Sequence, residues 1–257
     1  INSKVARFVR SPFARGSILG VELPENGLVF TASDLEGVRP IRPILNRPDY
    51  VAVDQPILAL DRVSYLGEPL AVVVADTQEE AEDLAEDVFF DIEPEEPVIG
   101  LNQALSPESP LVHSQASLNT LVDGNIRTPS VEESFATAAE IIEIELTSNR
   151  QVAMAIEARG GYAKYDRHSK RVTLFASVQM PHVLRTGIAD SLGISEGLLR
   201  VVAPDVGGAF GQKLALVPEY VILVWLSRKL LEGVRWIEDR RENLTSSFHA
   251  RDQKHRI

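Results

Sequence analysis

The 257-residue chain has an ordinary globular composition, with 44% hydrophobic and 25% charged residues and a formal net charge of −11. It contains no cysteine, which excludes disulfides, thiolate zinc sites and iron–sulfur clusters within this sequence, and no apolar run approaches the roughly 18–20 residues of a membrane span. Ten acidic residues and no basic ones lie between Glu79 and Glu96, and no basic stripe occurs elsewhere, so we expect no nucleic-acid partner.

The first part of the chain alternates strand and helix patterns. Short apolar or alternating runs predict strands at 5–10, 17–23, 27–31, 57–63 and 67–75, the last two as a pair. We expect Ser33 to cap a helical turn. Residues 38–50 hold three prolines and are predicted to form a loop.

The clearest helix begins at Thr77. Glu80 completes a capping box with it, and apolar residues then recur at 81, 84, 85 and 88, the spacing of one helical face. The acidic segment 79–96 is interpreted as the solvated face of this helix and the turn after it. A strand at 89–92 ends in the sequence Glu-Pro-Glu-Glu-Pro, 93–97, which predicts a domain boundary near residue 98.

Residues 99–130 have little periodicity and are predicted to be a connector before a second domain, 131–257. That domain is predicted to contain helices at 131–139, 181–192 (with Pro181 in its first turn and Gly193 at its end) and 218–229, strands at 141–146, 198–203 and 234–238, and a hairpin formed by 160–166 and 171–177. A further strand is due after 249–252. Because both ends of the sequence lie at predicted strands and it begins at Ile1, we expect a fragment of a longer polypeptide.

The stretch Val201–Lys213 (VVAPDVGGAFGQK) predicts a strand, a glycine-dense loop and then a helix. Gly207, Gly208 and Gly211 can take positive φ, and the freed N–H groups of such a loop can bind an oxyanion or a phosphate. It is not a nucleotide P-loop, because Leu214 follows Lys213 where Ser or Thr is needed. On these residues alone, a plain strand-to-helix turn and an anion site both remain open.

Five stretches together carry a resemblance, in order along nearly the whole chain: Phe8–Pro12 (FVRSP), Gly67–Thr77 (GEPLAVVVADT), Gln151–Arg159 (QVAMAIEAR), Ala176–His182 (ASVQMPH) and Val206–Lys213 (VGGAFGQK). In order and spacing they resemble the large, molybdopterin-binding subunit of the molybdenum hydroxylases, the family of xanthine dehydrogenase, aldehyde oxidase and aerobic carbon monoxide dehydrogenase. The joint order is more specific than any single motif.

The resemblance implies an α+β fold in which 1–98 is a small α/β hammerhead-like domain and 131–257 is the first part of a molybdopterin-binding α+β domain. It implies an oxidoreductase that hydroxylates an aldehyde or N-heteroaromatic C–H with water-derived oxygen. The implied cofactor is molybdenum-molybdopterin in the cytosine dinucleotide form. A 2Fe-2S subunit, an FAD subunit and the remainder of the large subunit are the implied partners, and the absence of a signal peptide predicts a cytoplasmic location.

The resemblance also assigns site residues. Gln179 matches the glutamine whose amide lies near the molybdenum oxo group. Phe210, with Gly207, Gly208, Ala209 and Gly211, matches the loop that packs beside the apical ligand of the metal. Apart from the resemblance, Gln179 would be an ordinary surface amide and Phe210 a core aromatic. No protein side chain is expected to ligate the metal.

Several positions depart from the family pattern. Leu214 stands where xanthine-type enzymes have a purine-contacting glutamate, which argues against purine hydroxylation, and Ala158 replaces a proline. The family's catalytic base lies in a GxGE element beyond residue 257, and Glu157 belongs to a motif with a structural role, so we expect this chain alone to be inactive. Two alternatives stay open: a non-catalytic assembly module or split subunit of such a complex, and an anion-binding protein without redox chemistry.

Overall fold

The computed structural model describes residues 3–43, 45 and 47–257, which fall into two compact units. The larger unit holds the described residues up to Arg42 together with Asp54–Pro97 and Val152–Phe248. The smaller unit holds the described residues of 43–53 together with Val98–Gln151 and His249–Ile257. Every predicted site residue lies in the larger unit.

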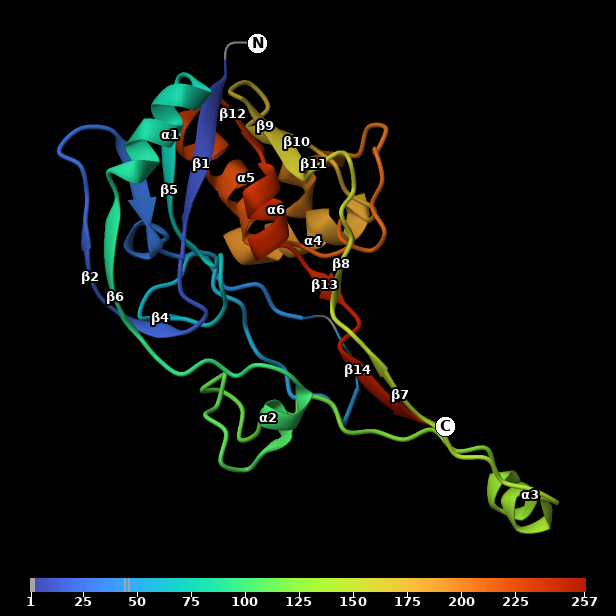
Figure 1. Cartoon of the computed structure of the whole chain (residues 1–257). Coiled ribbons are helices and arrows are strands. Elements are labelled where there is room, and N and C mark those ends of the chain that lie inside the picture. Colours follow the sequence, from blue (N-terminus) through green and yellow to red (C-terminus); the bar gives the residue numbers. More distant parts are fainter. Residues whose placement is uncertain (1–2, 44, 46) are drawn as a thin grey trace. The chain divides into compact units, whose positions relative to one another are not determined.

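A seven-stranded mixed sheet forms the centre of the larger unit (Figure 1), in the order β11-β10-β9-β12-β1-β5-β3. β1 is parallel to β12 and β10 is parallel to β11, whereas the other neighbours are antiparallel. The sheet therefore joins strands from both sides of the predicted connector. Its strands are β1 (Lys4–Arg10), β3 (Leu28–Thr31), β5 (Pro69–Ala75), β9 (Gly160–Asp166), β10 (Arg171–Ala176), β11 (Leu199–Val202) and β12 (Gly233–Ile237).

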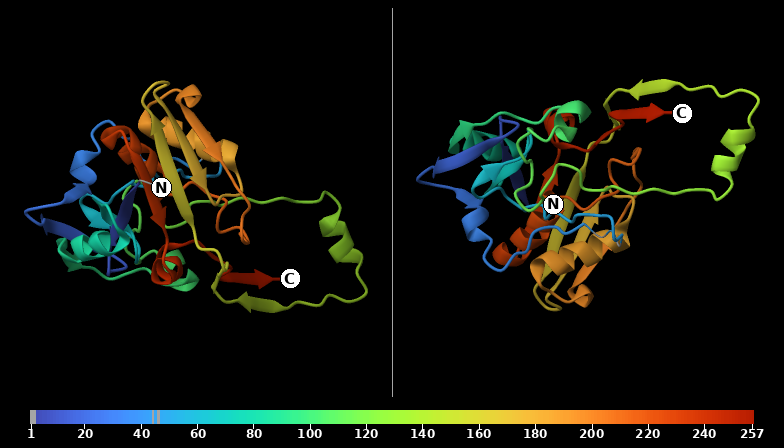
Figure 2. Two further views of the ribbon diagram at one scale, coloured as in Figure 1. Left: turned by 90° about the horizontal axis from the view of Figure 1, so that it is seen from above. Right: turned by 90° about the horizontal axis from the view of Figure 1, so that it is seen from below.

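Helices cover both faces of this sheet (Figures 1 and 2). α1 (Gln78–Glu86) packs on one face, where Val73 of β5 and Ala81 share a buried cluster. Val72 and Val74 alternate to the other face and join the largest core, which includes most of α5 (Pro218–Leu230) and part of α4 (Pro181–Leu192). α5 is buried along most of its length, which explains its nearly continuous apolar sequence.

The remaining elements of the larger unit are short. β2 (Gly16–Glu22), β4 (Arg62–Val63) and β6 (Phe89–Pro94) form a three-stranded sheet. α6 (Arg240–Ser246) follows β12 and begins at Asp239, whose side chain accepts a hydrogen bond from the Glu242 N–H. The 3-10 turns of this unit are η1 (Ala32–Asp34) and η2 (Glu196–Leu198). Gln151 and His249–Ala250, which belong to the smaller unit, lie in the strands β8 (Gln151–Val152) and β13 (His249–Ala250), which form a two-stranded sheet.

The smaller unit is poor in buried apolar residues. It contains α2 (Leu101–Leu105), α3 (Val131–Thr137) and an antiparallel pair of strands, β7 (Glu145–Ser148) and β14 (Gln253–Arg256). Its ribbon is supported by an exposed ion pair between Arg256 and Glu143. A bridge between Tyr50 and Val122 ties the described residues 47–53 to the rest of this unit. Across the described residues, no helix combines the length and apolarity that crossing a bilayer requires.

Most predicted elements are confirmed, including the capping box of Thr77 and Glu80 and the left-handed Gly193 that ends α4. The predicted strand 57–63 is wrong, because only Arg62–Val63 is a strand and it pairs with β2. Residues 57–59 are buried core residues of a loop. A buried loop segment needs apolar residues, and its sequence therefore has the same apolar run as a buried strand. The turn at 32–34 is capped by Thr31 with Asp34, not by Ser33. The strand predicted at 141–146 lies instead at Glu145–Ser148.

Glu68, just before β5, is a buried carboxyl group that accepts a hydrogen bond of 2.6 Å from the Ser64 N–H. Desolvation raises the pKa of Glu68 from 4.5 to about 7, against the opposing effect of backbone hydrogen bonds. In the unfolded chain the carboxyl group ionises near pH 4.5, so the unfolded state loses the proton first. Stability is therefore lost as the pH rises from about 4.5 to about 7.

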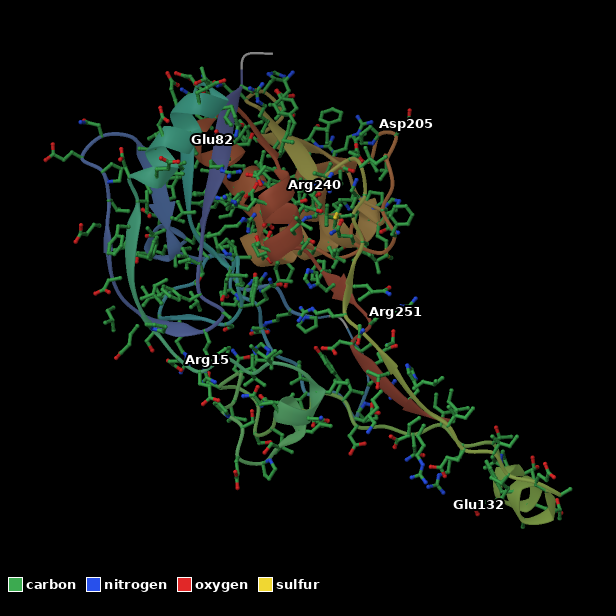
Figure 3. All side chains as sticks on the ribbon, in the orientation of Figure 1. Arg15, Glu82, Glu132, Asp205, Arg240 and Arg251 are labelled. Atoms are coloured by element: carbon green, nitrogen blue, oxygen red, sulfur yellow. The ribbon has the colours of Figure 1, made fainter. Side chains whose placement is uncertain are left out.

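We predict that Glu68→Gln, which mimics the protonated group, becomes increasingly stabilising with pH. Its advantage in free energy of unfolding over the wild type should grow by about 2 kcal/mol between pH 5.5 and pH 8, since one pKa unit corresponds to about 1.4 kcal/mol. Urea unfolding at the two pH values measures this difference. The exposed Glu82→Gln on α1 (labelled in Figure 3) is the control and should show no such trend. A pH-independent effect of Glu68→Gln would contradict the prediction.

Candidate functional site

The glycine loop after β11 owes its path to three residues with positive φ. These are Gly208 at 94°, Phe210 at 51° and Gly211 at 89°, whereas Gly207 does not have a positive φ. A side chain at Gly207 would instead meet the Glu157 Cβ at 2.8 Å. Thus two of the three glycines serve conformational freedom and the third serves a close approach.

The loop does not lead directly into a helix. Residues 210–215 form turns and bends, and α5 begins only at Pro218. The prediction that a helix directly follows Val201–Lys213 is therefore wrong. Loop N–H groups remain as donors: among the described residues, none accepts a hydrogen bond from the backbone N–H of Ala209, Phe210 or Gly211.

Phe210 projects from the loop with 77% of its surface exposed. Within this chain Phe210 is therefore a surface residue and not a core aromatic. Its ring edge lies close to Gly208, where a Cβ would stand 3.1 Å from the Phe210 Cε2. The left-handed conformation of Phe210 is uncommon for an aromatic residue, so the loop holds this ring outward at a conformational cost.

Gln179 lies between the end of β10 and the start of α4, at the edge of the glycine loop. Its backbone N–H donates to the Lys213 carbonyl at 2.9 Å, which brings the two predicted site segments together. Its side chain is exposed, and no described residue hydrogen-bonds to the side-chain amide. The amide is therefore available to an external group.

Glu157 ties the loop to the neighbouring strand end. Its Oε2 accepts hydrogen bonds from the Lys213 Nζ at 2.6 Å, the Ser177 Oγ at 2.6 Å and the Gly207 N–H at 2.8 Å. Desolvation alone would raise the pKa of Glu157, but the hydrogen bonds from Lys213, Ser177 and Gly207 lower it to about 2. A carboxylate with so low a pKa is a poor general base. Sequence reasoning assigned Glu157 a structural role and did not identify these partners.

The segment 155–159 that presents Glu157 is anchored on both sides. Arg240 of α6, labelled in Figure 3, donates to the carbonyls of Ala155 and Ile156, both at 3.0 Å. On the other side, Arg159 is buried and pairs with Glu238 through its Nε and Nη2, while its backbone N–H donates to the same carboxylate at 3.0 Å. Glu157 is therefore held by a fixed backbone.

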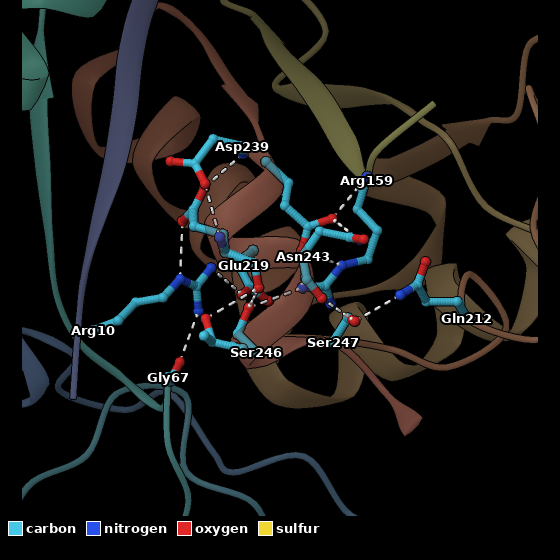
Figure 4. Close-up of polar contacts among 12 residues, drawn as sticks. Arg10, Gly67, Arg159, Gln212, Glu219, Asp239, Asn243, Ser246 and Ser247 are labelled. Carbon is cyan, nitrogen blue, oxygen red and sulfur yellow. Dashed lines mark hydrogen bonds and ion pairs between the residues drawn. The ribbon is translucent and has the colours of Figure 1, made fainter. Parts of the chain in front are cut away.

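A second buried network supports α6 (Figure 4). Arg10 donates to Glu219 at 2.7 Å, to Glu242 at 2.9 Å and to the Gly67 carbonyl at 3.1 Å. Desolvation of Arg10 opposes its charge, but Glu219 and Glu242 outweigh this and raise its pKa. Arg7 adds contacts to Glu242 and Asp239. The pairs with Glu242 and Asp239 fix the start of α6 against β1, and the pair with Glu219 ties α5 to the same strand. Sequence reasoning did not identify these ion pairs, because the partners are more than 200 residues apart.

Comparison with known proteins gives a consistent set of relatives. The model of the molybdopterin cofactor-binding domain family matches residues 112–257. The large subunit of nicotine 6-hydroxylase from Paenarthrobacter nicotinovorans is 34% identical over 255 residues, covering 96% of this chain and 31% of that protein. The carbon monoxide dehydrogenase large chain of Afipia carboxidovorans is 30% identical, covering 95% and 32%.

Among solved structures, quinoline 2-oxidoreductase from Pseudomonas putida 86 superposes with a TM-score of 0.90 at 32% identity. The match covers 98% of this chain and 33% of that one. The chain thus spans about a third of the length of the relatives it matches. The α+β fold expected from the sequence is confirmed by this superposition.

Proposed function

The chain belongs to the molybdopterin cofactor-binding family of molybdenum hydroxylase large subunits, and we propose that it forms the glycine-loop side of the cofactor site in an enzyme that hydroxylates a substrate C–H with water-derived oxygen. One observation carries the proposal. Three consecutive N–H donors at Ala209, Phe210 and Gly211 and the side-chain amide of Gln179 lack partners among the described residues, and the two segments are joined at Lys213.

These residues fit a molybdopterin group. The cofactor presents oxo and phosphate oxygens, which accept hydrogen bonds, and the unpartnered N–H groups and the Gln179 amide are donors. Ala209, Phe210 and Gly211 would hold the group through the main chain, with Gly207 and Gly208 shaping the loop through their close approach to Glu157 and to the Phe210 ring. When bound, the cofactor supplies the two-electron oxidation of the substrate. The chain supplies fixed donors that need no reorganisation during the reaction.

We propose an N-heteroaromatic substrate, with an aldehyde as the second candidate. Two relatives in the comparison are named for nicotine and quinoline, both N-heteroaromatic compounds. Leu214, at the end of the loop, is half-exposed and apolar, so it offers no hydrogen bond to a purine. The exposed Phe210 ring, in the same loop, is suited to contact with a flat aromatic ring.

The complete enzyme is proposed to contain further parts. Iron–sulfur clusters need cysteine ligands, which this sequence lacks, so a 2Fe-2S subunit and an FAD subunit are proposed as partners together with the remainder of the large subunit. The pterin is proposed to carry a cytosine dinucleotide. The catalytic base is proposed to lie outside this chain, because Glu157, the carboxylate bonded to the loop, is held ionised by three donors. The hammerhead-like domain at 1–98 and the connector at 99–130 also remain predictions.

The test is to purify the assembled protein that carries this chain, together with the products of its neighbouring genes. Molybdenum is measured by mass spectrometry, and oxidation of quinoline, benzaldehyde and xanthine is followed with a dye acceptor in ¹⁸O-water. We expect about one molybdenum per chain, ¹⁸O in the product, and quinoline preferred over xanthine. A stable complex without molybdenum would favour the alternative of a non-catalytic assembly module.

A further inference from the structure

The loop and the strand end that carry the proposed site are joined by one side-chain cluster. Glu157 contacts three partners that belong to different parts of the site: Gly207 at the start of the loop, Lys213 at its end, and Ser177 just before Gln179. All three donate to the same oxygen, at 2.6–2.8 Å. A carboxylate in this position fixes both ends of the loop and the strand end at once.

Lys213 makes this cluster depend on the carboxylate of Glu157. Its side chain is fully buried, and Glu157 is its ion-pair partner among the residues that the structure describes. A buried ammonium group without a partner is unfavourable, so Lys213 stays at this place only with an ionised carboxylate beside it. Its own carbonyl accepts the Gln179 N–H. Displacement of Lys213 would therefore displace the backbone that aligns Gln179.

The Glu157 side of the cluster is preorganised. Arg240 holds the carbonyls before Glu157, and the Arg159–Glu238 pair holds the residues after it. The Glu157 side chain is 41% exposed, which shows that the carboxylate lies at the surface of the site instead of in the core. Its three donors, not burial, set its place.

We propose that Glu157 is a positioning residue that, through Lys213 and Ser177, clamps the 207–213 loop against the strand end bearing Gln179, and so sets the alignment of the donors that receive the cofactor. The inference rests on the proposed function for the identity of that cofactor. The clamp itself is a property of the chain and is testable without it.

The test compares Glu157→Gln with Glu196→Gln in the assembled protein. Glu196 is a matched control, because its side chain is also 41% exposed and is ion-paired, in this case to Arg185 of α4. Hydrogen exchange of the 205–214 segment is measured on protein prepared with and without molybdenum cofactor. For Glu157→Gln we expect at least a tenfold faster exchange in both preparations, whereas Glu196→Gln should match the wild type. Wild-type exchange rates in Glu157→Gln would overturn the proposal.

Two further readouts separate positioning from general destabilisation. In the loaded enzyme, Glu157→Gln should alter the line shape of the molybdenum electron paramagnetic resonance signal, whereas a loss of folded protein would lower only its amplitude. Ser177→Ala, which removes one of the three donors, should give a smaller change in exchange and covers the case that Glu157→Gln fails to fold. An unchanged line shape in Glu157→Gln, together with unchanged exchange in Ser177→Ala, would overturn the proposal of the clamp. A wild type without molybdenum would refute the proposed function, while the exchange comparison would still test the clamp.

Discussion

Replacement of Gln179 by alanine is expected to lower turnover of the assembled enzyme by about 10²-fold or more, while molybdenum content stays at the wild-type value. Removal of a single preorganised donor aimed at developing charge typically reduces turnover by about 10²- to 10³-fold. The substitution should leave the fold unchanged, since the Gln179 side chain is exposed and has no partner among the described residues. The main-chain bond from Gln179 to Lys213 does not depend on the side chain.

Steady-state kinetics and metal analysis on the same preparation test this prediction. Gln78→Ala provides a control, because Gln78 is a partly exposed glutamine on α1 whose side-chain amide donates to Glu82, on the opposite face of the sheet from the core containing α4 and α5. Turnover equal to the wild type would remove Gln179 from the reaction. A loss of molybdenum in proportion to turnover would instead make Gln179 a residue that retains the cofactor.

The parts of this site that are local in sequence could be predicted. The glycines at 208 and 211 predict a backbone of positive φ, which both residues adopt. The family resemblance implied that Gln179 belongs to the same site as this loop, and the Gln179 N–H donates to the Lys213 carbonyl. Helix boundaries could also be predicted where the capping residues are adjacent in sequence, as at Thr77 and Gly193. In each case the physical constraint acts over a few residues, so the pattern carries it.

The side chains that hold the site together could not be predicted, because their partners are far away in sequence. Glu157 and Lys213 are 56 residues apart, and Arg10 and Glu219 are 209 apart. A charged residue in a sequence is usually solvated, and nothing near Arg10 or Arg159 distinguishes them from surface arginines. The error at 57–63 has a related cause: burial by distant elements gives a loop the composition of a strand.

The buried arginine at 159 links fold stability to the site. Glu238 is fully buried and receives hydrogen bonds from the Arg159 backbone N–H at 3.0 Å, from its guanidinium group, and from the Asn243 side chain at 2.8 Å. The Arg159 guanidinium also lies over the Trp236 ring, 5.8 Å from its centroid. Desolvation opposes the charge of Arg159, but Glu219 and Glu238 raise its pKa, so the guanidinium group stays charged when folded.

We predict that Glu238→Ala lowers the free energy of unfolding by about 3–5 kcal/mol, because it leaves a buried guanidinium group without its carboxylate. Glu196→Ala, at a partly exposed pair, should change it by no more than about 1 kcal/mol. Urea unfolding of the two variants and the wild type makes the comparison. The double replacement Arg159→Met with Glu238→Met should recover much of the loss, since removing both charges is often nearly neutral.

The double variant also decides whether the pair serves the fold or the site. It leaves no unpaired buried charge, but it removes the bond between the Glu238 carboxylate and the Arg159 N–H, two residues after Glu157. We therefore expect the stability of the double variant to return toward the wild-type value. Hydrogen exchange in its 205–214 loop should nevertheless be faster than in the wild type. If both recovered together, Arg240 alone would suffice to anchor the Glu157 segment, and the buried pair would contribute to folding without aligning the loop.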